Sequence, residues 1–196
     1  MVYPVIPGIL TEYRVGLEGP LSNKAAAVWY DITSKYCVSY LSGMQDKLGH
    51  HQGKFRPRNP EKYKGDPTNI IYRSSWERIF MNWCDKKESV VAWQSEEKAL
   101  WYYDPIAKKK RRYFPDFLIK YENKDGNTIT EMIEIKPAKQ VAGPPQKPKR
   151  RTKSWMNAVK TYITNQAKWE AAAKICEERG WNFRIITEKE LGIKDK

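Results

Sequence analysis

Three polar residues interrupt two apolar segments in the middle of the chain, and their types suit metal-assisted chemistry. Asp116 lies within Arg112–Tyr121, and Glu134 and Lys136 lie within Ile129–Pro137. Both segments are rich in aromatic and branched residues, which is typical of β-strands. Two carboxylates can bind Mg²⁺, a hard cation that keeps several of its waters. An ammonium beside the metal could hold or activate a water for attack on a phosphodiester.

The loop between the two segments, Lys124–Asn127, decides whether these side chains meet. A two-residue Asp-Gly turn would send the two carboxylates to opposite faces of the sheet, because side chains alternate along a strand. A three-residue loop with Gly126 in the left-handed conformation is the next commonest hairpin, and it places Asp116 directly opposite Glu134. We predict the three-residue loop, with Lys136 following on the same face.

A plainer interpretation of this hairpin also fits the spacing. The polar residues could form a solvated outer face of an antiparallel pair, with one stabilising cross-strand contact and no metal. The spacing alone leaves both interpretations open.

Glu77 is a further acidic candidate, on a helix predicted over Ser74–Lys87. The helix has an apolar stripe that includes Trp76 and Phe80, and Glu77 lies beside this stripe, near the sheet. Ser74 followed three residues later by a glutamate is also a capping box, so a structural role competes with metal binding. The two roles are compatible with each other.

Further elements are predicted around this hairpin: strands over Val90–Gln94 and Leu100–Tyr103, a helix over Ser154–Arg179 and a final strand over Trp181–Thr187. Ser154 is the expected N-cap of the long helix. Gln166 lies in the middle of the apolar stripe of that helix, where a polar side chain needs a partner. It could reach the acidic site, or it could be a satisfied core glutamine.

The net charge of +13 favours a polyanionic partner such as nucleic acid. Residues 1–53 hold four basic and four acidic residues, so the whole excess lies beyond residue 53. Basic residues gather in three predicted loops, 53–67, 105–112 and 137–153, which could equally be solvated connections. The predicted DNA contacts are Lys54, Arg56, Arg58, Arg73, Lys109, Lys110, Arg111, Lys147, Lys149, Arg150, Arg151 and Lys153.

The neutral N-terminal part, residues 1–52, is predicted to be a separate extension ahead of a domain over residues 53–196. It begins as a Pro- and Gly-rich arm and continues as a helix from Ser22 to about Lys47 with an apolar stripe. That stripe could dock on a partner protein or pack on the chain's own domain.

The sequence predicts a protein made and kept in a cytoplasm. The N-terminus lacks the features of a signal peptide, and no apolar run is long enough to span a membrane. Cys37, Cys84 and Cys176 fit no zinc spacing, so we expect reduced packing residues.

The order of these features resembles the PD-(D/E)xK nuclease superfamily. The matching signature is Pro115-Asp116, an intervening hairpin and Glu134-x-Lys136, with Glu77 upstream on a helix. From about Gly53 onward, longer strings resemble the family of head completion nucleases of T-even-type tailed phages. These strings are Asn59–Asp66, Tyr72–Glu77, Arg112–Phe117, Ile133–Pro137 and Thr164–Trp169.

The resemblance implies an α/β fold, in which a mixed sheet flanked by helices forms a restriction-endonuclease-like core. It implies an endonuclease of double-stranded DNA that uses Mg²⁺, with Mn²⁺ as an alternative. Asp116 and Glu134 would be metal ligands together with the Ile135 carbonyl. Lys136 would position the water, and Glu77 would add a carboxylate.

The resemblance also implies a place in virion assembly. The protein would act in the host cytoplasm after DNA packaging and then stay in the virion near the portal and neck. Portal, neck or capsid proteins would contact residues 1–52. Two other functions remain open: a catalytically silent neck protein that binds DNA and plugs or docks on the portal, and a transposon-end or junction-cutting nuclease of the same superfamily.

Overall fold

The computed structural model of the chain describes residues 52–144, 146 and 148–193. The predicted N-terminal helix and Lys147 lie outside the described residues. The elements are β1 (Gly53–Phe55), η2 (Pro60–Lys62), β2 (Ile70–Tyr72), α4 (Ser75–Lys86), β3 (Val90–Ser95), β4 (Leu100–Asp104), β5 (Lys109–Tyr113), β6 (Phe117–Glu122), β7 (Thr128–Ile135), α5 (Ala138–Val141), α6 (Lys153–Glu178) and β8 (Asn182–Ile186).

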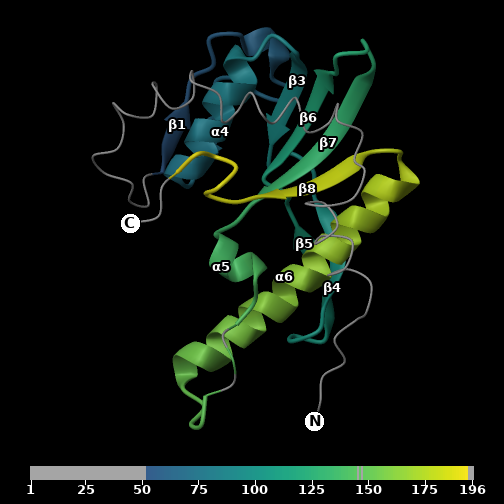
Figure 1. Ribbon diagram of the computed structural model, residues 1–196. Helices are drawn as coiled ribbons and strands as arrows, with labels where there is room; N and C mark the ends of the chain where they lie inside the picture. Colours follow the sequence, from purple (N-terminus) through teal and green to yellow (C-terminus); the bar gives the residue numbers. More distant parts are fainter. Residues whose placement is uncertain (1–51, 145, 147, 194–196) are drawn as a thin grey trace.

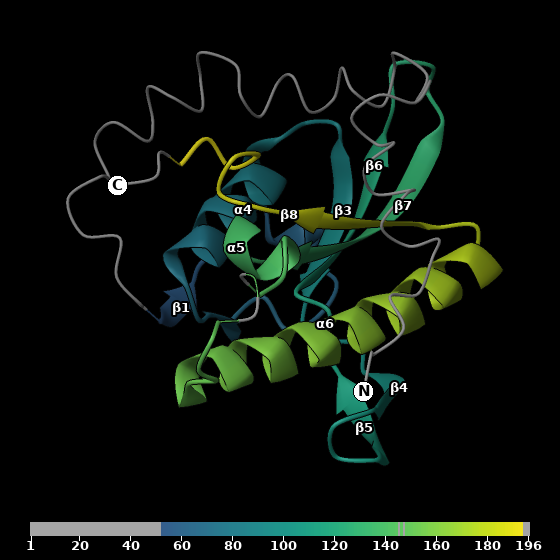
Figure 2. The ribbon, with the colours of Figure 1, turned by 60° about the horizontal axis from the view of Figure 1, so that its bottom comes forward.

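The predicted mixed sheet flanked by helices is confirmed. Four strands are ordered β3-β6-β7-β8, with antiparallel pairs except for the parallel pair of β7 and β8. Helices α4 and α6 lie on opposite sides of this sheet (Figures 1 and 2). The two-stranded β4–β5 hairpin lies on the α6 side. Among the described residues, no helix combines the length and the apolar character needed to cross a membrane.

Each face of the sheet has its own apolar cluster. On the α4 face, Phe117, Ile119 and Ile133 are fully buried and pack in one cluster with Phe80 of α4. On the other face, Met132 packs with Leu100, Tyr102, Tyr113, Ala172 and Cys176, which belong to β4, β5 and α6. Both faces of the central hairpin are therefore covered.

The three-residue loop predicted for the central hairpin is confirmed. Phe117 pairs with Ile133 and Glu122 with Thr128, and this register continues to Asp116 opposite Glu134. Asn123 N donates to Asn127 O at 2.9 Å, and Gly126 has a φ of +78°. The plainer interpretation, a solvated outer face, is wrong because Glu134 is only 2% exposed.

Two predicted basic loops are more ordered than expected. Lys109–Tyr113 forms strand β5 against β4, because Asp104 Oδ1 accepts from Ile106 N and Ala107 N and confines the turn to the residues in between. In 53–67, β1 places Phe55 against Trp93. The sequence prediction missed these strands because the basic residues of both segments do not alternate with apolar ones.

Two helix details also differ from the predictions. Thr152, and not Ser154, is the N-cap of α6, since its side chain accepts from Trp155 N at 3.1 Å. In α4 the buried residues are Phe80, Met81, Cys84 and Asp85, whereas Trp76 of the predicted stripe is half-buried against the same apolar cluster. Asp85 is a buried residue that the prediction missed, and its carboxylate accepts from the backbone amides of Arg58 and Asn59.

Replacing Gly126 by alanine tests the loop that sets the hairpin register. We expect a loss of about 1–2 kcal/mol in the free energy of unfolding, because a side chain is strained at positive φ. An added Cβ would meet nothing within 4 Å, so no clash adds to this cost. Denaturant unfolding measures the change, with Gly126→Asn as the control, since asparagine tolerates this conformation better. A neutral Gly126→Ala variant would contradict the proposed role of the loop.

Candidate active site

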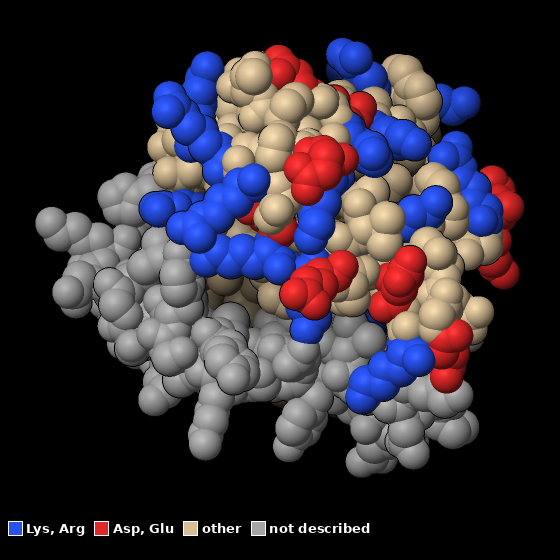
Figure 3. Space-filling model, turned by 90° about the horizontal axis from the view of Figure 1, so that it is seen from above, with Lys and Arg blue, Asp and Glu red and all other residues tan. Residues whose placement is uncertain are grey.

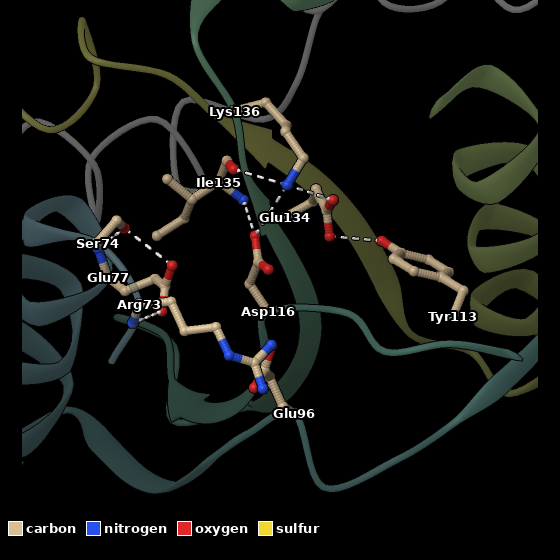
Figure 4. A network of polar contacts seen from close by, with 9 residues as sticks. All are labelled: Arg73, Ser74, Glu77, Glu96, Tyr113, Asp116, Glu134, Ile135 and Lys136. Atoms are coloured by element: carbon tan, nitrogen blue, oxygen red, sulfur yellow. Dashed lines mark hydrogen bonds and ion pairs between the residues drawn. The ribbon is translucent and has the colours of Figure 1, made fainter. Parts of the chain in front are cut away.

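The candidate active site lies where the start of β6 meets the end of β7. Asp116 directly precedes β6, whereas Glu134 and Ile135 end β7 and Lys136 follows at once. Antiparallel pairing brings these two strand ends together, so the side chains of Asp116, Glu134 and Lys136 and the backbone of Ile135 lie at the same end of the sheet. Figure 4 shows the Asp116, Glu134 and Lys136 side chains turned toward one another.

The contacts among these residues are short and specific. Ile135 N donates to Asp116 Oδ2 at 2.7 Å, which holds the carboxylate against β7. Lys136 Nζ lies 2.8 Å from Glu134 Oε1 and 3.6 Å from Asp116 Oδ2. It also donates to the Ile135 carbonyl oxygen at 3.1 Å. The ammonium thus contacts both carboxylates and the carbonyl that the nuclease resemblance implies as metal ligands.

Tyr113 of β5 fixes the second oxygen of Glu134. Its hydroxyl donates to Glu134 Oε2 at 2.6 Å, and Lys168 of α6 lies 5.5 Å from the centre of its ring. Burial and the neighbouring Glu134 raise the pKa of Tyr113 far above its usual range, so the hydroxyl stays a donor. Sequence reasoning missed this residue, although it lies in the same segment as Asp116.

The two acids make the site strongly negative. Burial, followed by the charge of Glu134, raises the pKa of Asp116 to about 7, and Lys136 only partly offsets this rise. Burial by itself would lower the pKa of Lys136, but Asp116 and Glu134 outweigh it and the pKa is raised. Lys136 therefore stays an ammonium, and the site has a negative charge that a second cation would relieve.

An open cavity of about 400 Å³ lies over these groups. It mixes acidic, basic and aromatic side chains, and four of its lining residues are cationic. The lining residues are Arg73, Glu96, Arg112, Tyr113, Phe114, Asp116, Glu134, Lys136 and Lys168. A cavity of this kind can accept a phosphate near the acids while its cationic wall holds the flanking charge.

Glu77 has the capping role that its spacing predicts. Glu77 N donates to Ser74 Oγ at 3.1 Å, and the Glu77 carboxylate accepts from Arg73 N and Ser74 Oγ. It is absent from the cavity lining, yet its charge contributes to raising the pKa of Asp116. Glu77 therefore caps the N-terminus of α4, and its charge also acts on Asp116. Direct metal binding by Glu77 stays a prediction.

Glu96 is an acidic residue at the cavity that sequence reasoning missed. It follows β3, has a φ of +50° and forms an ion pair with Arg73. Burial raises its pKa, and Glu77 adds to the rise against the charge of Arg73. A left-handed conformation at a non-glycine residue is uncommon and is often found at functional sites. The backbone conformation of Glu96 is what marks it as a candidate site residue, and no sequence pattern predicts that conformation.

The structure does not bring Gln166 to the cavity wall. Its side chain is half-buried on α6, and Lys168 is the residue of that helix that lines the cavity. The preceding Asn165 is the buried polar residue, and its amide nitrogen has no hydrogen-bond partner among the described residues. Trp169 and Cys176 of the predicted stripe are buried, but the buried polar position is Asn165, so a role for Gln166 at the site gains no geometric support.

The described basic residues predicted to bind DNA lie on three parts of the surface. Lys54, Arg56 and Arg58 are exposed beside β1, and the basic residues of β5 are exposed on its hairpin. Arg73 pairs with Glu96, and Arg111 pairs with Asp104 at 3.3 Å. The third group, at the start of α6, is Lys149, Arg150, Arg151 and Lys153. Figure 3 shows basic side chains spread over the face seen from above, with acidic side chains among them.

The oxygen donors at this site are of the kind that a hard divalent cation binds. Within residues 52–144, 146 and 148–193, no group of three or more His, Cys, Asp or Glu side chains could hold a metal ion. Mg²⁺ needs only one or two carboxylates because it keeps several waters. Asp116, Glu134 and the Ile135 carbonyl supply such a set, and the Lys136 ammonium already bonds to two of these groups.

The fold and the geometry of the site define a nuclease-like α/β protein, and comparison with known families agrees. Residues 87–188 match the family described as TnsA-like endonuclease N terminal. The chain belongs to this family. The match contains Asp116, Glu134 and Lys136, and it starts after Glu77.

The chain is also similar to one curated protein over most of its length. The chain is 42% identical over 151 residues to the head completion nuclease of Enterobacteria phage T4. The match covers 74% of this chain and 97% of the relative. The resemblance to phage head completion nucleases seen in the longer sequence strings is thereby confirmed.

Replacing Asp116 by asparagine tests the electrostatic cost of the site. Because the folded-state pKa lies above the ordinary value, the ionised carboxylate destabilises the fold above about pH 7, and the penalty fades as pH falls toward 4. We expect Asp116→Asn to raise the free energy of unfolding by roughly 2 kcal/mol at pH 8 in EDTA. Denaturant unfolding at pH 8 and pH 4.5 measures it.

The pH dependence is the internal control for this variant. The gain should shrink at pH 4.5, where the wild-type carboxyl is protonated in the folded state. An equal change in the free energy of unfolding at both pH values would show that ionisation of Asp116 does not affect stability, which would contradict its raised pKa.

Proposed function

We propose that this protein is a Mg²⁺-dependent DNA endonuclease that acts in phage head completion. The observation that carries the proposal is the convergence of Asp116, Glu134 and Lys136 at one edge of the sheet. The 42% identity to a head completion nuclease supports both the activity and the stage of assembly. Mg²⁺ is favoured by the two-carboxylate donor set, with Mn²⁺ as an alternative.

The residues of the site have separable roles in phosphodiester hydrolysis. Asp116 and Glu134 would hold the metal together with the Ile135 carbonyl. The bound metal would offset negative charge that develops on the scissile phosphate. Tyr113 keeps Glu134 oriented, since it donates to the oxygen that Lys136 does not contact. This arrangement fixes the carboxylate before substrate arrives, which reduces the cost of ordering it during the reaction.

Lys136 acts as a hydrogen-bond donor in this scheme, and not as a base. Its pKa is raised by the two adjacent carboxylates, so it keeps its proton at neutral pH. An ammonium has three donors and no acceptor. Lys136 can therefore hold the attacking water by its oxygen or stabilise a phosphate oxygen, and the proton of the water must leave to another acceptor.

Duplex DNA would approach through the cationic wall of the cavity. Arg73, Arg112 and Lys168 stand around the acids and would contact phosphates on either side of the cleaved bond. Without such residues, the two carboxylates would repel the DNA backbone. The exposed basic residues beside β1, on β5 and ahead of α6 would extend this contact along the duplex.

The place of action follows the name of the relative. We propose that the chain acts after DNA packaging in the host cytoplasm and remains near the portal and neck of the virion. Residues 53–196 would form the nuclease domain. Residues 1–52 would dock on a portal, neck or capsid protein, in keeping with their zero net charge.

Cleavage of linear and circular duplex DNA with Mg²⁺ tests the proposed activity. We expect Glu134→Ala and Lys136→Ala each to reduce the cleavage rate by at least about 100-fold, because each removes a group that contacts metal, water or phosphate. Lys120→Ala, an exposed lysine of β6, is the matched control and should cleave normally. Equal cleavage by all four proteins would mean contamination. Tight, salt-sensitive binding without cleavage would favour a structural neck protein.

Two substitutions of Glu77 separate its capping role from a catalytic one. Glu77→Gln keeps an oxygen for the Arg73 amide, so the free energy of unfolding should change by less than about 0.5 kcal/mol while cleavage falls. Glu77→Ala should also lose about 1 kcal/mol of stability. Unfolding and cleavage assays on the same preparations measure both effects. A Glu77→Gln variant with full cleavage would reduce Glu77 to a cap.

A further inference from the structure

The outer face of the β4–β5 hairpin exposes two large aromatic rings. Trp101 is 64% exposed and Tyr103 is 57% exposed, whereas Leu100, Tyr102 and Asp104 between and beside them are buried. The alternation shows that the exposure follows from the strand geometry, with one face packed and the other in solvent. Two adjacent exposed aromatic rings are uncommon on a protein surface and mark contact sites.

Cationic side chains lie directly across from both rings. Trp101 pairs with Arg112 and Tyr103 pairs with Lys110 in the β4–β5 register. The outer face of this hairpin therefore presents two aromatic rings and two cations. We call these four residues, Trp101, Tyr103, Lys110 and Arg112, the hairpin face. The acid of this hairpin, Asp104, is buried and bonds to the turn, so it does not neutralise the face.

The hairpin face leads into the candidate active site. Arg112 lines the cavity, as does Phe114, which is 41% exposed. Asp116 follows two residues later at the same cavity. In Figures 1 and 2 the hairpin projects past α6, away from the four-stranded sheet. A strand of DNA that crosses the hairpin face can thus continue to the acids without leaving the protein surface.

We propose that the hairpin face binds unpaired bases, so that the substrate is DNA in which a single-stranded segment adjoins a duplex. This inference rests on the proposed nuclease function and names its substrate class. Bases within a duplex have both faces covered by neighbours, so exposed aromatic rings gain stacking only from unpaired bases. The cations opposite the rings would contact the phosphates of the same strand.

The spacing of the rings fits a single strand. Trp101 and Tyr103 are two positions apart in β4, so their backbones are separated by roughly 6.6 Å, because each residue of a strand rises about 3.3 Å. Successive bases stacked in a duplex are about 3.4 Å apart, so the two rings suit nucleotides that have separated from each other. Protein partners are less favoured, since the hairpin face carries two cations and its only acid is turned inward.

Binding in EDTA tests the inference without requiring cleavage. The full chain is titrated against two labelled DNAs that share one duplex, one blunt and one with an unpaired arm of about six nucleotides. The variants are Trp101→Ala/Tyr103→Ala and Trp101→Phe. The matched control is Ile71→Ala/Val91→Ala, which removes exposed apolar side chains elsewhere on the surface. A 2-aminopurine base in the arm reports stacking directly.

We expect wild type to bind the armed DNA at least about tenfold more tightly than the blunt duplex. The double aromatic variant should lose at least about tenfold on the armed DNA alone, since stacking contributes about 1–3 kcal/mol per base. It should also lose the quenching of 2-aminopurine, whereas Trp101→Phe keeps it. Lys110→Ala should weaken binding to the armed DNA and reduce the salt slope of that binding by about 1.

Several results would overturn the inference. These are equal wild-type affinity for the two DNAs, equal losses on both DNAs in the aromatic variant, or the same loss in the Ile71/Val91 control. A separate Mg²⁺ assay keeps the two proposals apart. Cleavage without arm preference would remove only the inference about the hairpin face. A preference for the armed DNA without any cleavage would contradict only the proposed nuclease activity.

Discussion

The backbone pairing of β6 with β7 is the constraint on which the site depends. Its register puts Asp116 opposite Glu134, and the amide of Ile135 donates to the Asp116 carboxylate at 2.7 Å. A slip of one residue would turn the acids to opposite faces and expose the apolar residues that now meet α4. The same hydrophobic burial that stabilises the sheet therefore also fixes the distance between the two carboxylates.

That geometry costs stability, and the surrounding residues limit the cost. Partial burial, followed by repulsion from the adjacent Glu134, raises the pKa of Asp116 to about 7. Lys136 contacts both acids, and Tyr113 donates to Glu134, so neither carboxylate is left without a partner. A bound cation would relieve the remaining repulsion. A cluster of acids that costs stability in this way is typical of functional sites.

The sequence predicted the elements near the acids better than the residues that surround them. The loop at Gly126 could be deduced because hairpin length and side-chain alternation together decide one register. Glu96 and Lys168 could not, since each reaches the cavity through packing of segments distant in sequence from the acids. Tyr113 lies close to Asp116 in sequence, but its position depends on the pairing of β5 with β4 and on packing with α6. Gln166 failed for a related reason: helical periodicity identified α6, but the buried position is Asn165, and one residue is about 100° around a helix.

The alternation of side chains along the β4–β5 hairpin links the candidate active site to the proposed DNA contact. Its inward residues, Leu100, Tyr102 and Tyr113, pack with α6, and Tyr113 orients Glu134. Its outward residues form the hairpin face. Because neighbouring residues of a strand point in opposite directions, β4 cannot shift by one position without exchanging the two sets. The register that keeps Tyr113 at Glu134 therefore also keeps Trp101 and Arg112 together on the outer face, where we propose that DNA binds.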